Sequence, residues 1–147
     1  MNRSDADSDA VESQIHALLR SAHIIAVVGL SDDPTRPSYD VAQSLIRFGY
    51  RVVPVTPTIA SWQGLPAYSS LETAVAGLAP GERIDIVDVF RRPQYVGAIV
   101  DSCIALKLPT IWLQLGVSNE PEERRAREAG VTVIANKCIK VERMRLG

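Results

Sequence analysis

The sequence lacks a basic excess, a membrane-length apolar run and enough cysteine for a disulfide framework. Sixteen lysines and arginines face 17 aspartates and glutamates, a formal net charge of −1, which argues against nucleic acid as the main partner. No run approaches the roughly 20 apolar residues that cross a bilayer, and the acidic first ten residues lack the apolar core of a signal peptide. Cys103 and Cys138 fit neither a disulfide framework nor a zinc site. These absences predict a cytoplasmic protein whose cysteines are reduced. We expect it to bind neither nucleic acid nor membrane.

The composition that remains is that of a globular domain. Hydrophobic residues make up 46% of the 147 residues and charged residues 22%, which is enough apolar surface for one continuous core. We expect residues 1–9 to be a disordered leader and residues 10–147 to form a single domain.

Short apolar segments alternate with helix-length stretches along the chain. Strands that are apolar at every position are buried on both faces, which is typical of a parallel sheet covered by helices. The expected strands are Ile24–Val28, Arg51–Val55, Ile84–Val89, Thr110–Leu113 and Val131–Ile134. The expected helices are Ala10–Ser21, Ser38–Phe48, Leu71–Leu78, Pro93–Leu106 and Glu120–Ala129.

This alternation predicts an α/β fold, a Rossmann-like doubly wound parallel sheet of five strands. With right-handed crossovers the simplest strand order is 3-2-1-4-5, with a switch point between the first and fourth strands. Ligands bind beyond the carboxyl ends of strands at such a point. The loops after Gly29, Val55, Val89 and Leu113 are therefore expected to face the site.

The first of these loops has the features of a phosphate site. Gly29 permits a sharp turn, and Pro37 suits the first helical turn, where its missing N–H is no loss. Free amides there, with Ser31, Arg36 and Ser38 nearby, would suit a phosphate. The alternative is that Ser38 only caps the helix and Arg36 is a solvated charge.

The fingerprint of a dinucleotide-binding domain is incomplete. That fingerprint needs three glycines in the first turn and an acid at the end of the second strand. Here the turn has one glycine, and the second strand runs into Val55, Thr56, Pro57 and Thr58 without a carboxylate. This pattern speaks against NAD, although the same residues could form an apolar shelf for an adenine ring.

Two further loops carry candidate residues. Val89, Phe90 and Arg91 lead from a strand into a helix that begins with proline, and the two arginines at this strand end suit an anion. The alternative is that one arginine of the pair, Arg92 by preference, belongs to the plain surface. Gly116 stands where a ligand could approach the backbone closely, although a simple turn explains it equally well.

These residues together resemble the small bacterial CoA-binding proteins. The resemblance rests on five motifs in order: Gly29-x-Ser31 with Arg36-Pro37-Ser38, Val53-Pro54-Val55-x-Pro57, Asp88-Val89-Phe90-Arg91, Trp112-Leu113-Gln114-Leu115-Gly116 and Asn136-Lys137-Cys138. It covers about residues 15 to 147, and the fold it implies is similar to the amino-terminal CoA-binding domain of the succinyl-CoA synthetase alpha subunit. Where the family often has Asp-Arg-Cys-Pro, this chain has Asn136-Lys137-Cys138-Ile139.

The resemblance implies coenzyme A as the ligand and a role for each of the first three motifs. The pyrophosphate region would be held by Gly29, Ser31, Arg36 and Ser38. The adenosine would be lined by Val55, Pro57 and Thr58, and the pantetheine arm or its phosphates would pass Val89, Phe90 and Arg91.

Cys138 follows the last strand on the side where the ligand is expected. Two interpretations stay open: Lys137 and Lys140 favour its thiolate, which forms a mixed disulfide with the CoA thiol, or it is a packed and inert cysteine. Cys103 lies within an apolar helix and is expected in the core.

The sequence leaves three candidate functions open. The first is the binding of CoA or a short acyl-CoA without turnover, because no catalytic constellation is evident. The others are a nucleotide- or NAD-binding redox or regulatory protein, and an accessory subunit of an acyl-CoA ligase. Trp62 and Trp112 are candidates for a partner-facing surface, so a homo-oligomer is a further expectation.

Overall fold

A computed structural model describes residues 3–146 of the chain. Its elements, in chain order, are α1 (Arg3–Ser21), β1 (Ile24–Val28), α2 (Pro37–Arg47), β2 (Arg51–Val55), β3 (Ser61–Trp62), β4 (Leu65–Pro66), α3 (Leu71–Ala76), β5 (Ile86–Val89), the 3-10 turn η1 (Pro93–Tyr95), α4 (Val96–Leu106), β6 (Thr110–Leu113), α5 (Glu120–Glu128), β7 (Thr132–Ile134) and α6 (Ile139–Met144).

Five strands form one parallel sheet in the order β2-β1-β5-β6-β7. The predicted α/β, Rossmann-like class is therefore confirmed. Every position of β1, β5 and β6 is buried, as strands covered on both faces require.

The five full strands lie in the order 2-1-3-4-5 along the sheet, and the predicted pattern 3-2-1-4-5 is matched only when the segment around Tyr68 is counted as the third member and β7 as a sixth. The place beside β2 belongs to the segment around Tyr68, which forms a single parallel bridge with Val55 and too few ladder bonds to count as a full strand. The segment that we numbered third, now β5, pairs instead with β1. The switch point consequently lies between β1 and β5, and not between β1 and Thr110–Leu113.

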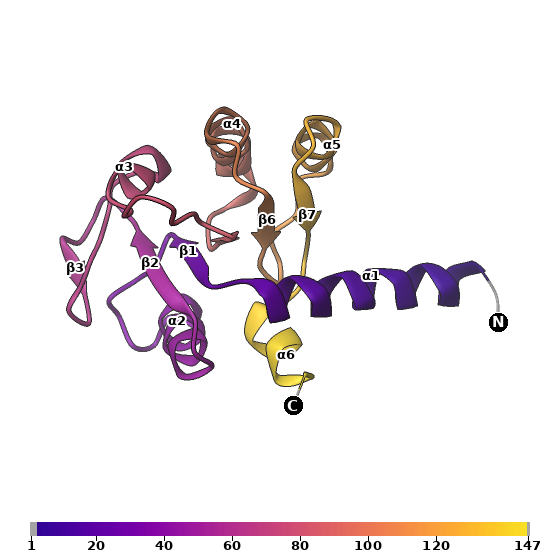
Figure 1. Ribbon diagram of the computed structural model, residues 1–147, viewed down its shortest axis with the longest axis horizontal. Helices are drawn as coiled ribbons and strands as arrows, with labels where there is room; N and C mark the ends of the chain where they lie inside the picture. Colours follow the sequence, from indigo (N-terminus) through magenta and orange to yellow (C-terminus); the bar gives the residue numbers. More distant parts are fainter. Residues whose placement is uncertain (1–2, 147) are drawn as a thin grey trace.

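Helices cover both faces of the sheet (Figure 1). Helices α3, α4 and α5 lie on one face, and α1, α2 and α6 lie on the other. Each face has its own apolar cluster, and Cys103 is fully buried in one of them, as expected. Trp62 and Trp112 are buried in the other, at 2% and 0% exposure, which corrects the expectation that they form a partner-facing surface.

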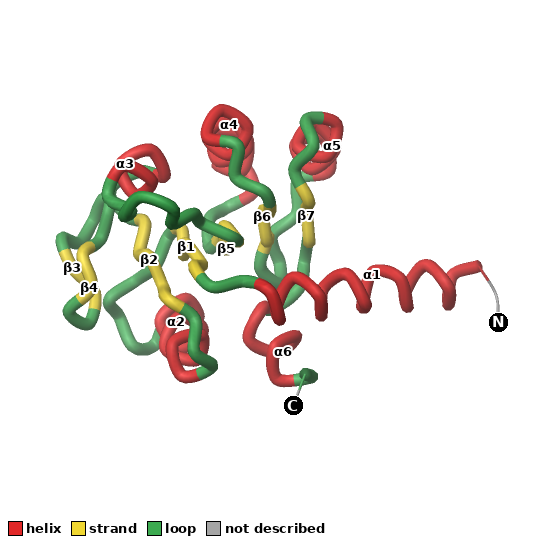
Figure 2. Tube along the Cα trace, viewed as in Figure 1, coloured by secondary structure: helices red, strands yellow, loops and turns green. Residues whose placement is uncertain are grey.

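Three features at the margins of the fold differ from the expectation. Helix α1 begins at Arg3, where we expected a disordered leader up to residue 9; residues 1 and 2 lie outside the described part. A short antiparallel hairpin, β3–β4, lies beside β2 (Figure 2), and α6 follows Cys138; the sequence suggested neither. Among residues 3–146, no helix has both the length and the apolar character needed to span a bilayer.

Candidate functional site

Two adjoining clefts open at the carboxyl ends of the central strands. The large cleft has a volume of about 770 Å³ and the small cleft about 280 Å³, and both share Gly29 and Arg91 at the β1–β5 switch point. Together they reach the size of typical ligand sites. The large cleft is lined by Gly29, Ser31, Arg36, Pro37, Ser38, Val41, Phe90, Arg91, Arg92, Pro93, Gln114, Leu115, Gly116, Val117 and Cys138. The small cleft is lined by Val28, Gly29, Val55, Pro57, Ser69, Ser70, Leu71, Glu72, Arg91, Tyr95, Ala98, Ile99 and Ser102.

Gly29 is required at the junction of the clefts for two reasons. Its φ of +84° lies in the left-handed region that side chains disfavour. A Cβ at this position would come within 2.3 Å of the Phe90 carbonyl oxygen and 3.1 Å of Cδ of Arg91. The missing side chain therefore lets the loops after β1 and β5 approach each other and lets Arg91 lie directly over the backbone.

The loop after β1 satisfies its own polar groups more fully than the sequence suggested. The Ser31 amide donates to Oγ of Ser38 at 3.0 Å, and the Gly29 amide donates to the Val55 carbonyl at 2.9 Å. These two amides are engaged, which corrects the picture of free amides around a phosphate. Arg36 lines the large cleft, with 70% of its side chain exposed and Nε 4.0 Å from the Asp33 carboxylate, so a bound anion could engage it readily.

The arginines after β5 both reach the large cleft. The Arg91 guanidinium lies 4.1 Å from the centre of the Tyr95 ring, a cation–π contact that orients it. Arg92 is exposed and lines the same cleft, where it lies beside Arg91. Proline at position 93 begins a new turn, which bends the chain so that both side chains stay at the strand end.

The far wall of the large cleft comes from the ends of β6 and β7. The Gly116 amide donates to Oδ1 of Asn136 at 2.8 Å, and Gln114, which is 5% exposed, accepts from the Ile139 amide at 3.1 Å through Oε1. Cys138 is half-buried at the start of α6 and lines this wall. Gln114 belongs to the fourth motif of the resemblance, for which no role was predicted from the sequence.

One of the two interpretations of Cys138 requires Lys137 and Lys140 to lie near its thiol and stabilise the thiolate. Lys140 forms an ion pair with Asp40 at 2.8 Å, and Lys137 lines a separate hollow between α1 and α6. Cys138 therefore faces the cleft without either lysine directed at it.

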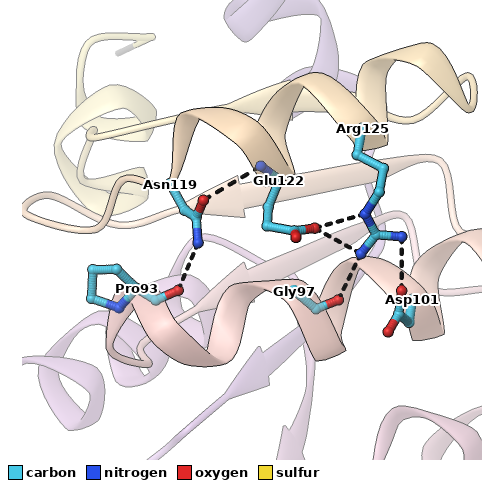
Figure 3. A network of polar contacts seen from close by, with 6 residues as sticks. All are labelled: Pro93, Gly97, Asp101, Asn119, Glu122 and Arg125. Carbon is cyan, nitrogen blue, oxygen red and sulfur yellow. Dashed lines mark hydrogen bonds and ion pairs between the residues drawn. The ribbon is translucent and has the colours of Figure 1, made fainter.

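A polar network fixes the outer rim of the large cleft (Figure 3). Asn119 caps α5 and donates through Nδ2 to the Pro93 carbonyl at 3.0 Å, which joins the loop after β6 to the start of α4. Further along, Arg125 is held by Glu122 of the same helix and bridges α5 to α4 through Asp101 and the Gly97 carbonyl. The two loops that carry Arg92 and Gly116 are thus held at a fixed separation.

The small cleft holds a carboxylate that the sequence did not indicate. Glu72, near the start of α3, lines it together with Ser70 and Ser102. A hydrogen bond from the Ser102 hydroxyl is the main cause that lowers the pKa of the Glu72 carboxyl below its usual value. Glu72 was missed because it comes after the hairpin, 17 residues beyond the last residue of β2.

Two predicted site residues lie outside both clefts. Val89 is completely buried, because its side chain points into the core beneath α3, α4 and α5. The Thr58 hydroxyl pairs with that of Thr56 at 3.0 Å within the turn after β2. Of the other candidates, nine line the large cleft and Val55 and Pro57 line the small one.

A family model and several known proteins match most of the chain. A family model described as a CoA binding domain matches residues 23–144. Protein YneT of Bacillus subtilis strain 168 is 38% identical over 130 residues, which are 88% of this chain and 92% of YneT. Protein ID.343 of Thermus thermophilus superposes with a TM-score of 0.83 at 36% identity, over 92% of this chain and 98% of that one. The dinucleotide forming acetyl-coenzyme A synthetase 1 of Ca. Korarchaeum cryptofilum shares the fold at 23% identity and a TM-score of 0.67, over 81% of this chain and 27% of that chain.

Proposed function

Since the chain belongs to the CoA binding domain family, we propose that it binds coenzyme A or a short acyl-CoA across the two clefts, without turning it over. One observation carries this proposal: three arginines, Arg36, Arg91 and Arg92, line the large cleft, and no carboxylate among residues 3–146 joins them there. Asp33 pairs with Arg36 from outside the cleft at 4.0 Å, so guanidinium groups still outnumber carboxylates there and favour a ligand with several negative charges.

The shapes of the clefts suggest how the ligand is oriented. The small cleft is bounded largely by apolar groups, including Val55, Pro57 and Ile99, and suits the flat adenine ring. The diphosphate would then lie over Gly29 and Arg91, where the clefts meet. The pantetheine arm would extend past Phe90 and Gln114 towards Cys138.

A second candidate, a nucleotide- or NAD-binding regulatory protein, has one observation in its favour. Glu72 lines the small cleft, and dinucleotide-binding domains use a carboxylate to hold ribose hydroxyls. An accessory role beside an acyl-CoA ligase is compatible with CoA binding and would need a partner chain.

Calorimetric titration with CoA, ATP and NAD distinguishes these candidates. We expect CoA to bind most tightly, because only CoA combines the diphosphate with an arm that fills the large cleft. Arg91→Met should weaken CoA binding by about tenfold or more, since a charge-assisted contact is worth roughly 1.5–3 kcal/mol. The matched control is Arg124→Met, an exposed arginine of α5 outside both clefts, which should leave the affinity unchanged. Binding of NAD without CoA would refute the proposal.

A further inference from the structure

The two clefts differ in charge more than in shape. Three arginines line the large cleft without a carboxylate among the described residues, whereas the small cleft has one arginine and one carboxylate. That arginine, Arg91, belongs to both clefts and lies at their junction. The only charge that belongs to the small cleft alone is therefore the negative charge of Glu72.

Glu72 is fixed as an anion at the rim of the small cleft. It is exposed, and it lies at the second position of α3, behind the Ser70 cap. The Ser102 hydroxyl of α4 stabilises the ionised carboxylate and lowers its pKa, so the charge is present at neutral pH. Both serines line the same cleft, and the Ser70 hydroxyl is engaged there by the Thr73 amide at 3.1 Å, which leaves Glu72 as the polar group that faces a ligand.

A ribose in the small cleft would meet this carboxylate. In the proposed placement the diphosphate lies over Arg91. Among the described residues, Arg91 is the only cation that lines the small cleft, so no further cation is left there to pair with a phosphate on the ribose. A phosphate on the ribose would bring up to two more negative charges beside Glu72, whereas an unmodified ribose would offer it hydroxyl donors.

We infer that Glu72 is a specificity-determining residue that disfavours a phosphorylated ribose, so that the preferred ligand is a CoA-type diphosphate with a free ribose 3′ hydroxyl. This inference rests on the proposed placement of the adenosine in the small cleft. It predicts that, at this CoA site, dephospho-CoA and related adenosine diphosphate esters with a pantetheine-like arm bind more tightly than their 3′-phosphorylated counterparts.

The test is a pair of titrations with CoA and dephospho-CoA, which differ only by the 3′-phosphate. Wild-type protein should bind dephospho-CoA the more tightly. Glu72→Gln should shift the ratio of the two dissociation constants towards CoA by about threefold to tenfold, the effect of one partly screened charge. The shift should shrink as salt is raised, which a purely structural effect would not do.

Two controls separate the possible outcomes. Glu72→Asp keeps the charge and should keep the wild-type preference, and Glu128→Gln removes an exposed charge of α5 outside both clefts and should change nothing. An unchanged ratio in Glu72→Gln, or a wild-type preference for CoA, overturns the inference and leaves the proposed function standing. Failure of both ligands to bind overturns the proposed function, and this inference with it.

Discussion

At the scale of single residues, Asp88 is the least expected group in the molecule. It lies in β5 between Val27 of β1 and Trp112 of β6, and it is completely buried. Neither of its carboxylate oxygens has a hydrogen-bond partner among residues 3–146. Burial raises the pKa of this carboxyl well above its usual value, so the folded protein favours the protonated acid.

This burial makes a pH-dependent contribution to stability. In the unfolded chain an aspartate loses its proton near pH 4, whereas folded Asp88 keeps its proton to a higher pH. Between these two values the unfolded state binds fewer protons, so the contribution of Asp88 to stability falls as the pH rises.

Asp88→Asn should remove that dependence, because the amide does not titrate. The free energy of unfolding of the variant, relative to wild type, should rise with pH above about 4, by up to about 1.4 kcal/mol per pH unit within the window. Urea unfolding of both proteins at several pH values measures the difference, and the other carboxylates cancel in it. A difference that stays constant with pH would show that Asp88 is already ionised in the fold.

At the scale of elements, the hairpin β3–β4 supports the loop that carries Ser31 and Arg36. Trp62 of β3 donates through Nε1 to the Ser31 carbonyl at 3.0 Å and contacts the Tyr39 ring edge-on at a centroid distance of 5.2 Å. A two-residue strand at the margin of the sheet thereby fixes one wall of the large cleft.

Trp62→Phe should loosen that wall while preserving the core. Losing one buried hydrogen bond should lower the free energy of unfolding by about 1–3 kcal/mol, since the Ser31 carbonyl is left without this donor. Hydrogen exchange should quicken at the Ser31 and Arg36 amides. Trp112→Phe, which removes a similar bond to the Lys137 carbonyl on another wall, should leave those two amides as protected as in wild type.

The elements that the sequence predicted well are those with a strong local signal. The strands Ile24–Val28, Arg51–Val55 and Thr110–Leu113 were predicted to the residue, because continuous burial leaves a continuous apolar run. The pairing of β5 with β1 could not be read in this way, since a parallel partner is chosen by long-range packing.

The residues of the clefts show the same contrast between local sequence signals and long-range packing. Gly29, Arg36 and Arg91 follow or approach strand ends, and topology alone places them together. Glu72 reaches the small cleft only because the chain after β2 passes through the hairpin before α3 returns over the sheet, and the two-residue strands of the hairpin have no apolar pattern long enough to reveal that return.

At the scale of the whole molecule, a nearly neutral chain concentrates positive charge at one end of its sheet. The net charge is −1, yet the large cleft carries three arginines at the switch point between β1 and β5. Helices on both faces shield the strands, so the strand ends are where a ligand can reach the backbone and these side chains together.

A single NMR titration tests most directly whether this end of the sheet holds CoA. In a ¹H–¹⁵N spectrum recorded during addition of CoA, the largest shifts should occur at the amides of the shared junction and of the two cleft walls: Gly29, Ser31, Ser38, Arg91 and Gly116. An absence of shifts, or shifts confined to the hollow between α1 and α6 around Val11 and Lys137, would contradict CoA binding at the strand ends.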